Sequence, residues 1–284
     1  MEIIVGKSAG FCGGVFNSVS KTEKALEDND YMYCLGEIVH NKQVVDKLTN
    51  KGLKVIDNLD NIKNEKVIVR AHGISKNIYE QANKNKVELI DLTCPKVLKI
   101  HQIAEDYVKD GYFIVLIAKK DHPEAIGTIG YCGEDSYVLE DDSGMDELLS
   151  KINNCKKNKV AVIAQTTYSV SKFEQLSSLI KDRVKGKEVI INSTICNATS
   201  IRQKECDEIS RNVDTMIIVG GKNSSNTKKL YEIACKNCPN SIIIETCVDL
   251  DVSLLKDSKK VGVMAGASTP KESIEEVIDL LKGR

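Results

Sequence analysis

Three of the ten cysteines in this 284-residue sequence, Cys12, Cys94 and Cys196, occupy matching places. Each follows an apolar, β-rich run and precedes a possible helix, in the segments IIVGKSAGFCGGVFNSV, VELIDLTCPKVLKI and VIINSTICNATSIRQ. They lie 82 and 102 residues apart, each about the length of one small domain. A free cysteine usually packs as a small apolar side chain. Three cysteines at equivalent turns favour a shared metal centre instead.

The number of these cysteines indicates which metal centre they would hold. Three thiolates could bind zinc, but a structural zinc site takes four protein ligands and no fourth candidate occupies an equivalent position. An iron–sulfur cube normally takes four cysteines. With three, one iron stays open to a substrate and serves as a Lewis acid as well as an electron carrier. The sequence predicts one oxygen-sensitive [4Fe-4S] cluster per chain. The C-x-x-C pair Cys235 and Cys238 is predicted to be surface or half-buried thiols, because no strand precedes it.

Histidines and a carboxylate occur in similar loops. His40, His72 and His122 follow strand-like runs, and Glu124 comes two residues after His122. A lone loop histidine is usually only solvated, but three of the four histidines at equivalent places favour ligand binding. An imidazole close to a carboxylate suits proton delivery. The fourth histidine, His101, lies within a predicted helix and is expected to be structural.

Two further turns are polar. Ser224, Ser225 and Asn226 follow one strand-like run, and Ser268 follows another. Hydroxyls, amides and backbone N–H groups in such turns bind anions, although the same residues would serve equally well as helix N-caps. Neither G-x-x-x-x-G-K-[ST] nor G-x-G-x-x-G occurs, which argues against nucleotide phosphates.

The elements that must position these residues alternate between strand and helix patterns along the whole chain, which is typical of α/β proteins. In open parallel sheets, ligands bind beyond the carboxyl ends of the strands, where these loops fall. We therefore expect three similar small α/β domains in a pseudo-threefold arrangement around a central iron–sulfur cluster, at residues 1–93, 94–192 and 193–284. The expected strands are 3–5, 33–35, 67–70, 88–92, 113–118, 160–164, 188–191, 216–219, 242–245 and 261–265.

The expected helices differ in clarity. After Cys12 and Cys94 the apolar residues keep helical spacing. After Cys196 the apolar positions only approximate that period. The third unit is therefore the least clearly defined.

The overall composition excludes several classes of function. The 40 basic and 41 acidic residues give a net charge of −1, with no footprint for nucleic acid and no polybasic membrane patch. The longest apolar run, 112–118, is too short to span a bilayer. The first residues lack the basic and apolar regions of a secretory signal. We expect a cytoplasmic enzyme whose partners are a small molecule or another soluble protein, with no nucleic acid and no membrane.

Taken together, the motifs resemble those of the 4-hydroxy-3-methylbut-2-enyl diphosphate reductases, the LytB/IspH family. The resemblance runs in order from about residue 3 to about residue 280. A mild departure follows GFC, where the family usually has Ala-Gly-Val and then Arg and this sequence has Gly13, Phe16 and Asn17. The matching motifs are GFCGGV, GEIVHN, RAHG, DLTCPKV, DHPE, QTT, CNATSIRQ, SSNT and GASTP.

This resemblance implies the last step of the non-mevalonate (MEP/DOXP) isoprenoid pathway. The reaction is a reductive dehydration of (E)-4-hydroxy-3-methylbut-2-enyl diphosphate to isopentenyl diphosphate and dimethylallyl diphosphate, with electrons from reduced ferredoxin or flavodoxin. Cys12, Cys94 and Cys196 would hold the cluster. Glu124 would be the catalytic acid, and Thr166 would position both Glu124 and the substrate hydroxyl. The substrate-binding residues would be His40, His72, His122, Thr166, Ser224, Ser225, Asn226 and Ser268.

Two other classes remain open from the residues alone. A three-cysteine [4Fe-4S] hydro-lyase would use the same open iron without net electron transfer. An iron or redox sensor would need the cluster but neither Glu124 nor the polar turns.

Overall fold

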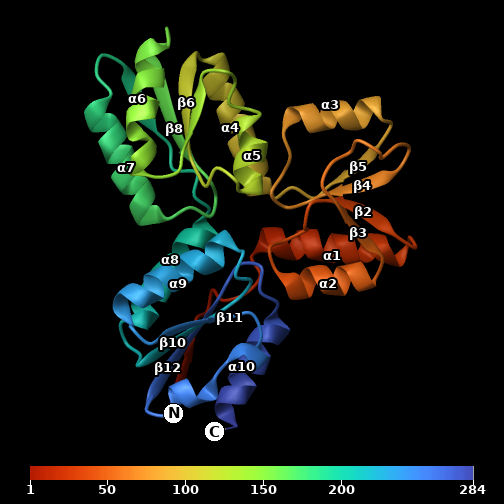
Figure 1. The fold of residues 1–284 in the computed structure, drawn as a ribbon, viewed down its shortest axis with the longest axis vertical. Coiled ribbons are helices and arrows are strands. Elements are labelled where there is room, and N and C mark those ends of the chain that lie inside the picture. Colours follow the sequence, from red (N-terminus) through yellow and green to blue (C-terminus); the bar gives the residue numbers. More distant parts are fainter. Residues whose placement is uncertain (284) are drawn as a thin grey trace. The chain divides into compact units, whose positions relative to one another are not determined.

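The structure is a computed structural model that describes residues 1–283. Within these residues, strands and helices alternate along the chain, and the strands form three four-stranded parallel sheets (Figure 1). This confirms the predicted α/β class with three similar domains. One sheet contains β1 (Glu2–Val5), β10 (Thr215–Val219), β11 (Ser241–Ile244) and β12 (Lys260–Ala265). A second contains β2 (Met32–Leu35), β3 (Leu53–Ile56), β4 (Lys66–Val69) and β5 (Glu88–Asp91). The third contains β6 (Tyr112–Ile117), β7 (Ser136–Leu139), β8 (Lys159–Ala164) and β9 (Glu188–Ile191).

Helices connect these strands. The α-helices are α1 (Gly13–Glu27), α2 (Lys42–Asn50), α3 (Lys76–Lys84), α4 (Pro95–Lys109), α5 (Pro123–Ile129), α6 (Met145–Asn154), α7 (Val170–Arg183), α8 (Asn197–Ser210), α9 (Ser225–Asn237) and α10 (Lys271–Lys282). Short 3-10 helices are η1 (Asp142–Gly144), η2 (Cys247–Asp249) and η3 (Val252–Leu255). No helix described within residues 1–283 combines the length and the apolar character needed to span a membrane.

All three sheets share one strand order. It reads β3-β2-β4-β5, β7-β6-β8-β9 and β11-β10-β12-β1. The N-terminal strand β1 thus takes the fourth place in the sheet formed by the C-terminal strands. The predicted segment 1–93 grouped β1 with β2 to β5, whereas β1 pairs in parallel with β12 and its Ile3 packs on that sheet's core. The predicted domain boundaries as such stay a prediction.

The sheets also share a register. In each, the third strand begins with a lysine that is aligned with a glutamate at the start of the fourth strand. Two of these aligned pairs are exposed ion pairs, Lys66 with Glu88 at 3.9 Å and Lys260 with Glu2 at 3.2 Å between nitrogen and oxygen. Exposed ion pairs contribute little stability. The lysine–glutamate alignment instead shows that the three sheets repeat the same register. The aligned residues are Lys66 with Glu88, Lys159 with Glu188, and Lys260 with Glu2.

The sheet of β6 to β9 has helices on both faces (Figure 1). Alternate residues of the fully buried strand β6 point to opposite sides. Val115 and Ile117 pack with α6 and α7, while Ile114 and Leu116 pack with α4 and α5. Burial on both faces explains why β6 reads as a continuous apolar run.

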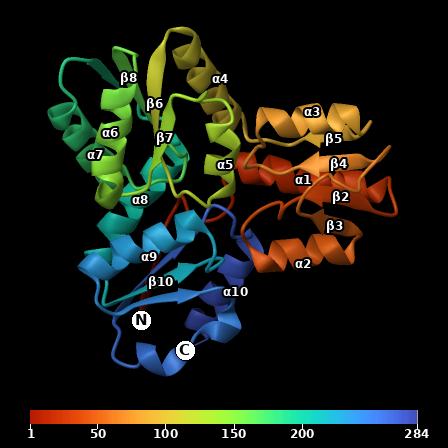
Figure 2. The same ribbon diagram turned by 45° about the horizontal axis from the view of Figure 1, so that its top comes forward.

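The sheet that contains β1 is built in the same way (Figure 2). Ile217 and Val219 of β10 pack with α10, and Met216 and Ile218 pack with α8 and α9. The chain divides into two compact units. The first unit comprises residues 1–19, 39–50 and 197–284, and the second comprises 20–38 and 51–196.

Candidate active site

Each of the three predicted cluster cysteines lies in the turn between the fourth strand of a sheet and the next helix. Cys12 precedes α1, Cys94 precedes α4 and Cys196 precedes α8. In every case the cysteine N–H donates to the carbonyl of the residue two positions beyond the third strand of the same sheet. The three turns are therefore built alike. The acceptors are Ala267 for Cys12 at 3.2 Å, Ala71 for Cys94 at 3.0 Å and Thr166 for Cys196 at 3.0 Å.

The three cysteine thiols are also similar in environment. All ten cysteines are free, and Cys12, Cys94 and Cys196 are half-buried. Several others are buried in cores, where the loss of solvent raises the thiol pKa to about 12. Neutral buried thiols of that kind pack as small apolar groups and do not ligate metal. These core cysteines are Cys34, Cys132 and Cys206.

The carbonyls that accept from the cysteines belong to loops with predicted substrate contacts. Ala71 precedes His72, Ala267 precedes Ser268, and the third acceptor is Thr166 itself. Each cysteine turn is thus fastened to the neighbouring strand-end loop of its own sheet. Ligand binding at these loops and metal binding at the cysteines would act on the same backbone.

Glu124 and Thr166 are in direct contact. Glu124 lies in the first turn of α5, with 2% of its surface exposed. Its Oε1 accepts from the Thr166 N–H at 2.6 Å, and its Oε2 accepts from the Thr166 hydroxyl at 2.5 Å. The Thr166 carbonyl in turn accepts from the Cys196 N–H. A hydrogen-bonded path through one residue therefore joins the predicted acid to a predicted cluster ligand.

The protonation of Glu124 is set by its surroundings. Burial raises the pKa of Glu124 to about 7, although the hydrogen bonds from the Thr166 hydroxyl and N–H act to lower it. A carboxyl group with a pKa near neutrality retains much of its proton at pH 7. It can therefore donate that proton to a leaving group during a reaction.

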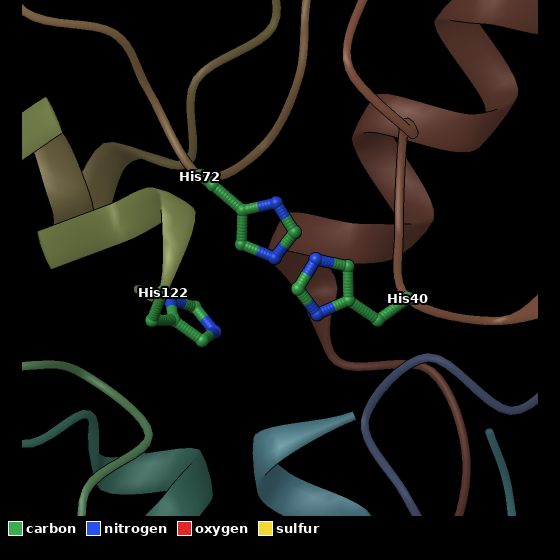
Figure 3. Close-up of side chains that lie close together, drawn as sticks. All are labelled: His40, His72 and His122. Carbon is green, nitrogen blue, oxygen red and sulfur yellow. The ribbon is translucent and has the colours of Figure 1, made fainter. Parts of the chain in front are cut away.

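His122 supports the same turn. Its Nδ1 accepts from the Glu124 N–H at 3.1 Å, so it is the N-cap of α5. Because Nδ1 is an acceptor, the proton of the neutral ring lies on Nε2, which can donate to a ligand. The ring of His72 lies edge to face with that of His122, with centroids 5.3 Å apart and planes at 85° (Figure 3).

His101 packs beneath the RAHG loop. Gly73 has a φ of +75°, and a Cβ there would come within 2.9 Å of the His101 ring. The His101 ring also stacks on the Tyr131 ring, with the ring centroids 4.0 Å apart. Burial lowers the pKa of His101 to about 4, so the ring stays neutral. This geometry agrees with a structural role and explains why glycine follows His72.

The polar turn after β10 contains a buried amide without partners. Ser224 is the N-cap of α9, where its Oγ accepts from the Thr227 N–H at 3.3 Å, and half-buried Ser225 begins the helix. Asn226 is 3% exposed, and neither atom of its amide group has a hydrogen-bond partner among the described residues. A buried polar group left unpaired costs roughly 1–3 kcal/mol. Two such atoms at a helix N-terminus point to a bound polar ligand.

Ser268 and His40 belong to neighbouring loops of the first unit. The Ser268 hydroxyl donates to the His40 carbonyl at 3.2 Å. His40 lies just before α2, and its ring is also labelled in Figure 3. Asn41, which the sequence analysis did not single out, accepts from the Val44 N–H at 3.2 Å at the start of α2. An asparagine directly before a helical pattern is the sequence signal of such a cap.

Comparison with known proteins places these features in a family. The family model described as LytB protein matches residues 3–282. The chain belongs to the LytB family. Two relatives named 4-hydroxy-3-methylbut-2-enyl diphosphate reductase come from Alkaliphilus oremlandii and Clostridioides difficile. The first is 40% identical and covers 98% of each chain, and the second is 39% identical and covers 99% of each.

Solved structures agree with this LytB assignment. The structure of the E-1-hydroxy-2-methyl-but-2-enyl-4-diphosphate reductase from Plasmodium falciparum has a TM-score of 0.89 at 31% identity, over 99% of this chain and 88% of that one. A structure of (E)-4-hydroxy-3-methyl-but-2-enyl diphosphate reductase, described as the terminal enzyme of the non-mevalonate pathway, has a TM-score of 0.71 at 38% identity, over 100% of both chains. The resemblance drawn from the motifs is confirmed.

Two charged residues of this LytB protein were missed from the sequence. Arg202 and Glu205 on α8 both contact the loop that leads to Cys12. The available signal was the poor apolar period of that helix. Its inward face is polar, and the buried residues of α8 are Thr199, Arg202, Gln203, Cys206 and Ser210.

Proposed function

We propose that the chain reduces (E)-4-hydroxy-3-methylbut-2-enyl diphosphate to isopentenyl diphosphate and dimethylallyl diphosphate. The single observation that carries this proposal is the hydrogen-bonded path from Glu124 through Thr166 to Cys196, which would join the proposed proton donor to a proposed metal-binding turn. The names of the full-length relatives support the same substrate.

The cysteine turns fit one [4Fe-4S] cluster per chain. Iron–sulfur clusters are held by cysteine thiolates, and the three equivalent turns present three half-buried thiols on similar backbone. Cys12, Cys94 and Cys196 would be the ligands. When bound, the cluster supplies electrons and, at the iron without a cysteine, a Lewis-acidic site for the substrate oxygen.

The polar turns would hold the diphosphate. The partnerless amide of Asn226 offers a hydrogen-bond donor at the N-terminus of α9, where the helix dipole also favours an anion. Ser224 and Ser225 flank it in the same turn. The imidazole N–H groups and the serine hydroxyl of four further residues can donate hydrogen bonds to phosphate oxygens. These remaining proposed contacts are His40, His72, His122 and Ser268.

Glu124 would deliver the proton that turns the leaving hydroxyl into water. The reaction takes up two electrons and two protons: the allylic C–O bond breaks, one proton leaves in water, and the other adds to an allylic carbon to give either isomer. Thr166 orients the Glu124 carboxyl group through both of its oxygens. Burial raises the Glu124 pKa to about 7, so a large fraction of the carboxyl groups carry the transferable proton at neutral pH.

A small electron-transfer protein is the remaining partner. The proposed reaction consumes electrons that neither the substrate nor any side chain of the chain provides. Reduced ferredoxin or flavodoxin would supply them, which also fits the expected cytoplasmic location.

The decisive experiment is anaerobic turnover of the allylic diphosphate by iron-loaded protein with a reduced low-potential dye. We expect both isomeric products, with two electrons consumed per molecule formed. Product formation without consumption of electrons would indicate a hydro-lyase. Absence of any product from protein with a full complement of iron would refute the proposal.

A further inference from the structure

The loop of residues 6–12, which ends at Cys12, is hydrogen-bonded to two oppositely charged side chains of α8. Arg202 donates to two loop carbonyls, from Nε to Ser8 at 2.8 Å and from one terminal nitrogen to Gly10 at 3.0 Å. Arg202 as a residue is 3% exposed, and the other terminal nitrogen of its guanidinium donates to the Ala198 carbonyl in the first turn of the same helix at 3.2 Å. Arg202 thus ties the loop backbone to the start of α8.

Glu205, one turn further along α8, binds the donors of the same loop. Its Oε1 accepts from the Lys7 N–H at 2.7 Å, and its Oε2 accepts from the Ser8 N–H at 2.8 Å and from the Ser8 hydroxyl. Burial acts to raise the pKa of Glu205, but the hydrogen bonds from Ser8 and Lys7 outweigh it and hold the pKa below its usual value. The carboxylate is therefore charged when it holds the loop.

The loop is packed on its other side as well. Gly10 has a φ of +96°, and a Cβ there would come within 3.1 Å of Ile274 on α10 and 3.5 Å of the Thr269 carbonyl. Beyond it, the Cys12 N–H is bonded to Ala267. In the loop, the carbonyls of Ser8 and Gly10 are thus bonded to Arg202 and the N–H groups of Lys7 and Ser8 to Glu205.

We propose that Arg202 and Glu205 are positioning residues that hold Cys12 in place for cluster binding by fixing residues 7–10 against α8. Cys196 directly precedes α8, so one helix carries a predicted ligand before its first residue and fixes the loop of another. A cysteine on a fixed loop binds metal without a further cost of ordering the backbone. Both residues bind the backbone of residues 7–10, so their effect on metal binding would pass through Cys12.

Hydrogen exchange of the iron-free protein tests the loop directly. Arg202→Met removes the hydrogen bonds to Ser8, Gly10 and Ala198 while keeping an unbranched side chain. Glu205→Gln leaves one acceptor oxygen where two are used. We expect faster exchange confined to residues 6–12 in both variants, with β10 to β12 unchanged. A role limited to general stability would instead speed exchange throughout that sheet.

Release of iron from the loaded protein to a chelator tests the consequence. Loss of groups that orient metal ligands typically costs about 10–100-fold in metal affinity or activity, and we expect iron release to speed up within that range. Arg202→Lys should recover part of the effect, because one cationic donor remains. Arg211→Met is the matched control, since Arg211 forms an exposed pair with Asp207 beyond the loop's reach.

The possible outcomes separate this inference from the proposed function on which it rests. If the unaltered protein takes up no iron, the proposed function fails. Exchange in residues 6–12 then still decides whether Arg202 and Glu205 fix the loop. If Arg202→Met does not fold, the milder Glu205→Gln decides both measurements. Unchanged exchange in the loop, or unchanged iron release despite faster exchange, would overturn the positioning role.

Discussion

At the scale of single residues, the geometry of Glu124 leads to a prediction about pH. The carboxyl group has a raised pKa of about 7 and is protonated below it, so turnover should fall as pH rises above about 7. Glu124→Gln keeps the size and can still accept a hydrogen bond from Thr166, but it has no proton to give. We expect turnover to drop about 10²–10⁴-fold and the pH dependence above 7 to disappear. Steady-state rates between pH 6 and about 9 measure both effects.

The control for this variant is Glu134→Gln, which neutralises an exposed carboxyl group in the loop before β7. Cluster absorbance and KM should be unchanged in both proteins. A Glu124→Gln enzyme with an intact cluster and near-normal turnover would place the proton donor elsewhere, with His122 the next residue to examine.

The amide of Asn226 should affect binding and stability in opposite directions. Asn226→Ala removes a proposed donor to the diphosphate, and loss of a hydrogen bond to a charged group costs roughly 1.5–3 kcal/mol, or about 10–150-fold in KM. The same change removes two buried atoms that lack partners, so the ligand-free protein should be no less stable. Substrate titration and thermal melting report the two quantities. Asn223→Ala, at an exposed position in the same loop, is the control. Equal KM in both variants would remove Asn226 from the site.

At the scale of elements, the three cysteine turns should depend on one another. Anaerobically purified protein should contain about four irons and four sulfides per chain and lose iron in air. Serine in place of Cys12, Cys94 or Cys196 should each abolish cluster retention, because a single cube needs all three thiolates. Serine in place of Cys132 or Cys235 should leave the iron content unchanged. Iron and sulfide analysis decides this, and stoichiometric zinc in a fully active aerobic preparation would contradict it.

The same scale shows what could be predicted from the sequence. Ten strands were placed within about a residue or two of their observed bounds, because buried strands read as apolar runs. Two were missed, β3 and β7, and both are edge strands: β3 has two exposed residues in LKVI, and β7 alternates in SYVL. The helix after Cys196 was unclear because its inward face binds a loop through polar side chains. The contact between Glu124 and Thr166 was implied only by the family resemblance, because 42 residues separate the two and no local pattern links them.

At the scale of the whole molecule, the chain closes its last sheet with its first strand. A repeat visible in the sequence marks this closure: KVIV, KVAVIA and KVGVMA begin with the lysines, and ELID, EVII and EIIV begin with the glutamates. EIIV is the last member by structure and the first by sequence. Reading the chain from its N-terminus hides this relation, which is why the predicted domain of residues 1–93 groups β1 with β2 to β5.

This closure predicts a remote effect of a change in β1. Ile3 packs on the core formed by β10, β12 and α10, so Ile3→Ala should destabilise that sheet by about 1–3 kcal/mol. Hydrogen exchange should accelerate in residues 215–265, far along the sequence, and not in residues 112–191. Val5→Ala, at a more exposed position of β1, should have a smaller effect. Faster exchange in β2 to β5 instead would contradict the pairing.

The pairing of β1 with β12 also affects when this sheet can form during synthesis on the ribosome. β1 and Cys12 are synthesised about 250 residues before β12, the strand beside β1. Sheets β2–β5 and β6–β9 can form while synthesis continues, because domains fold as units as they emerge. Cys12 reaches its hydrogen-bonded turn only after residue 267 has been added. A nascent chain therefore cannot present all three cysteine turns before residue 267 has been added, so insertion of the proposed cluster would have to wait for β12.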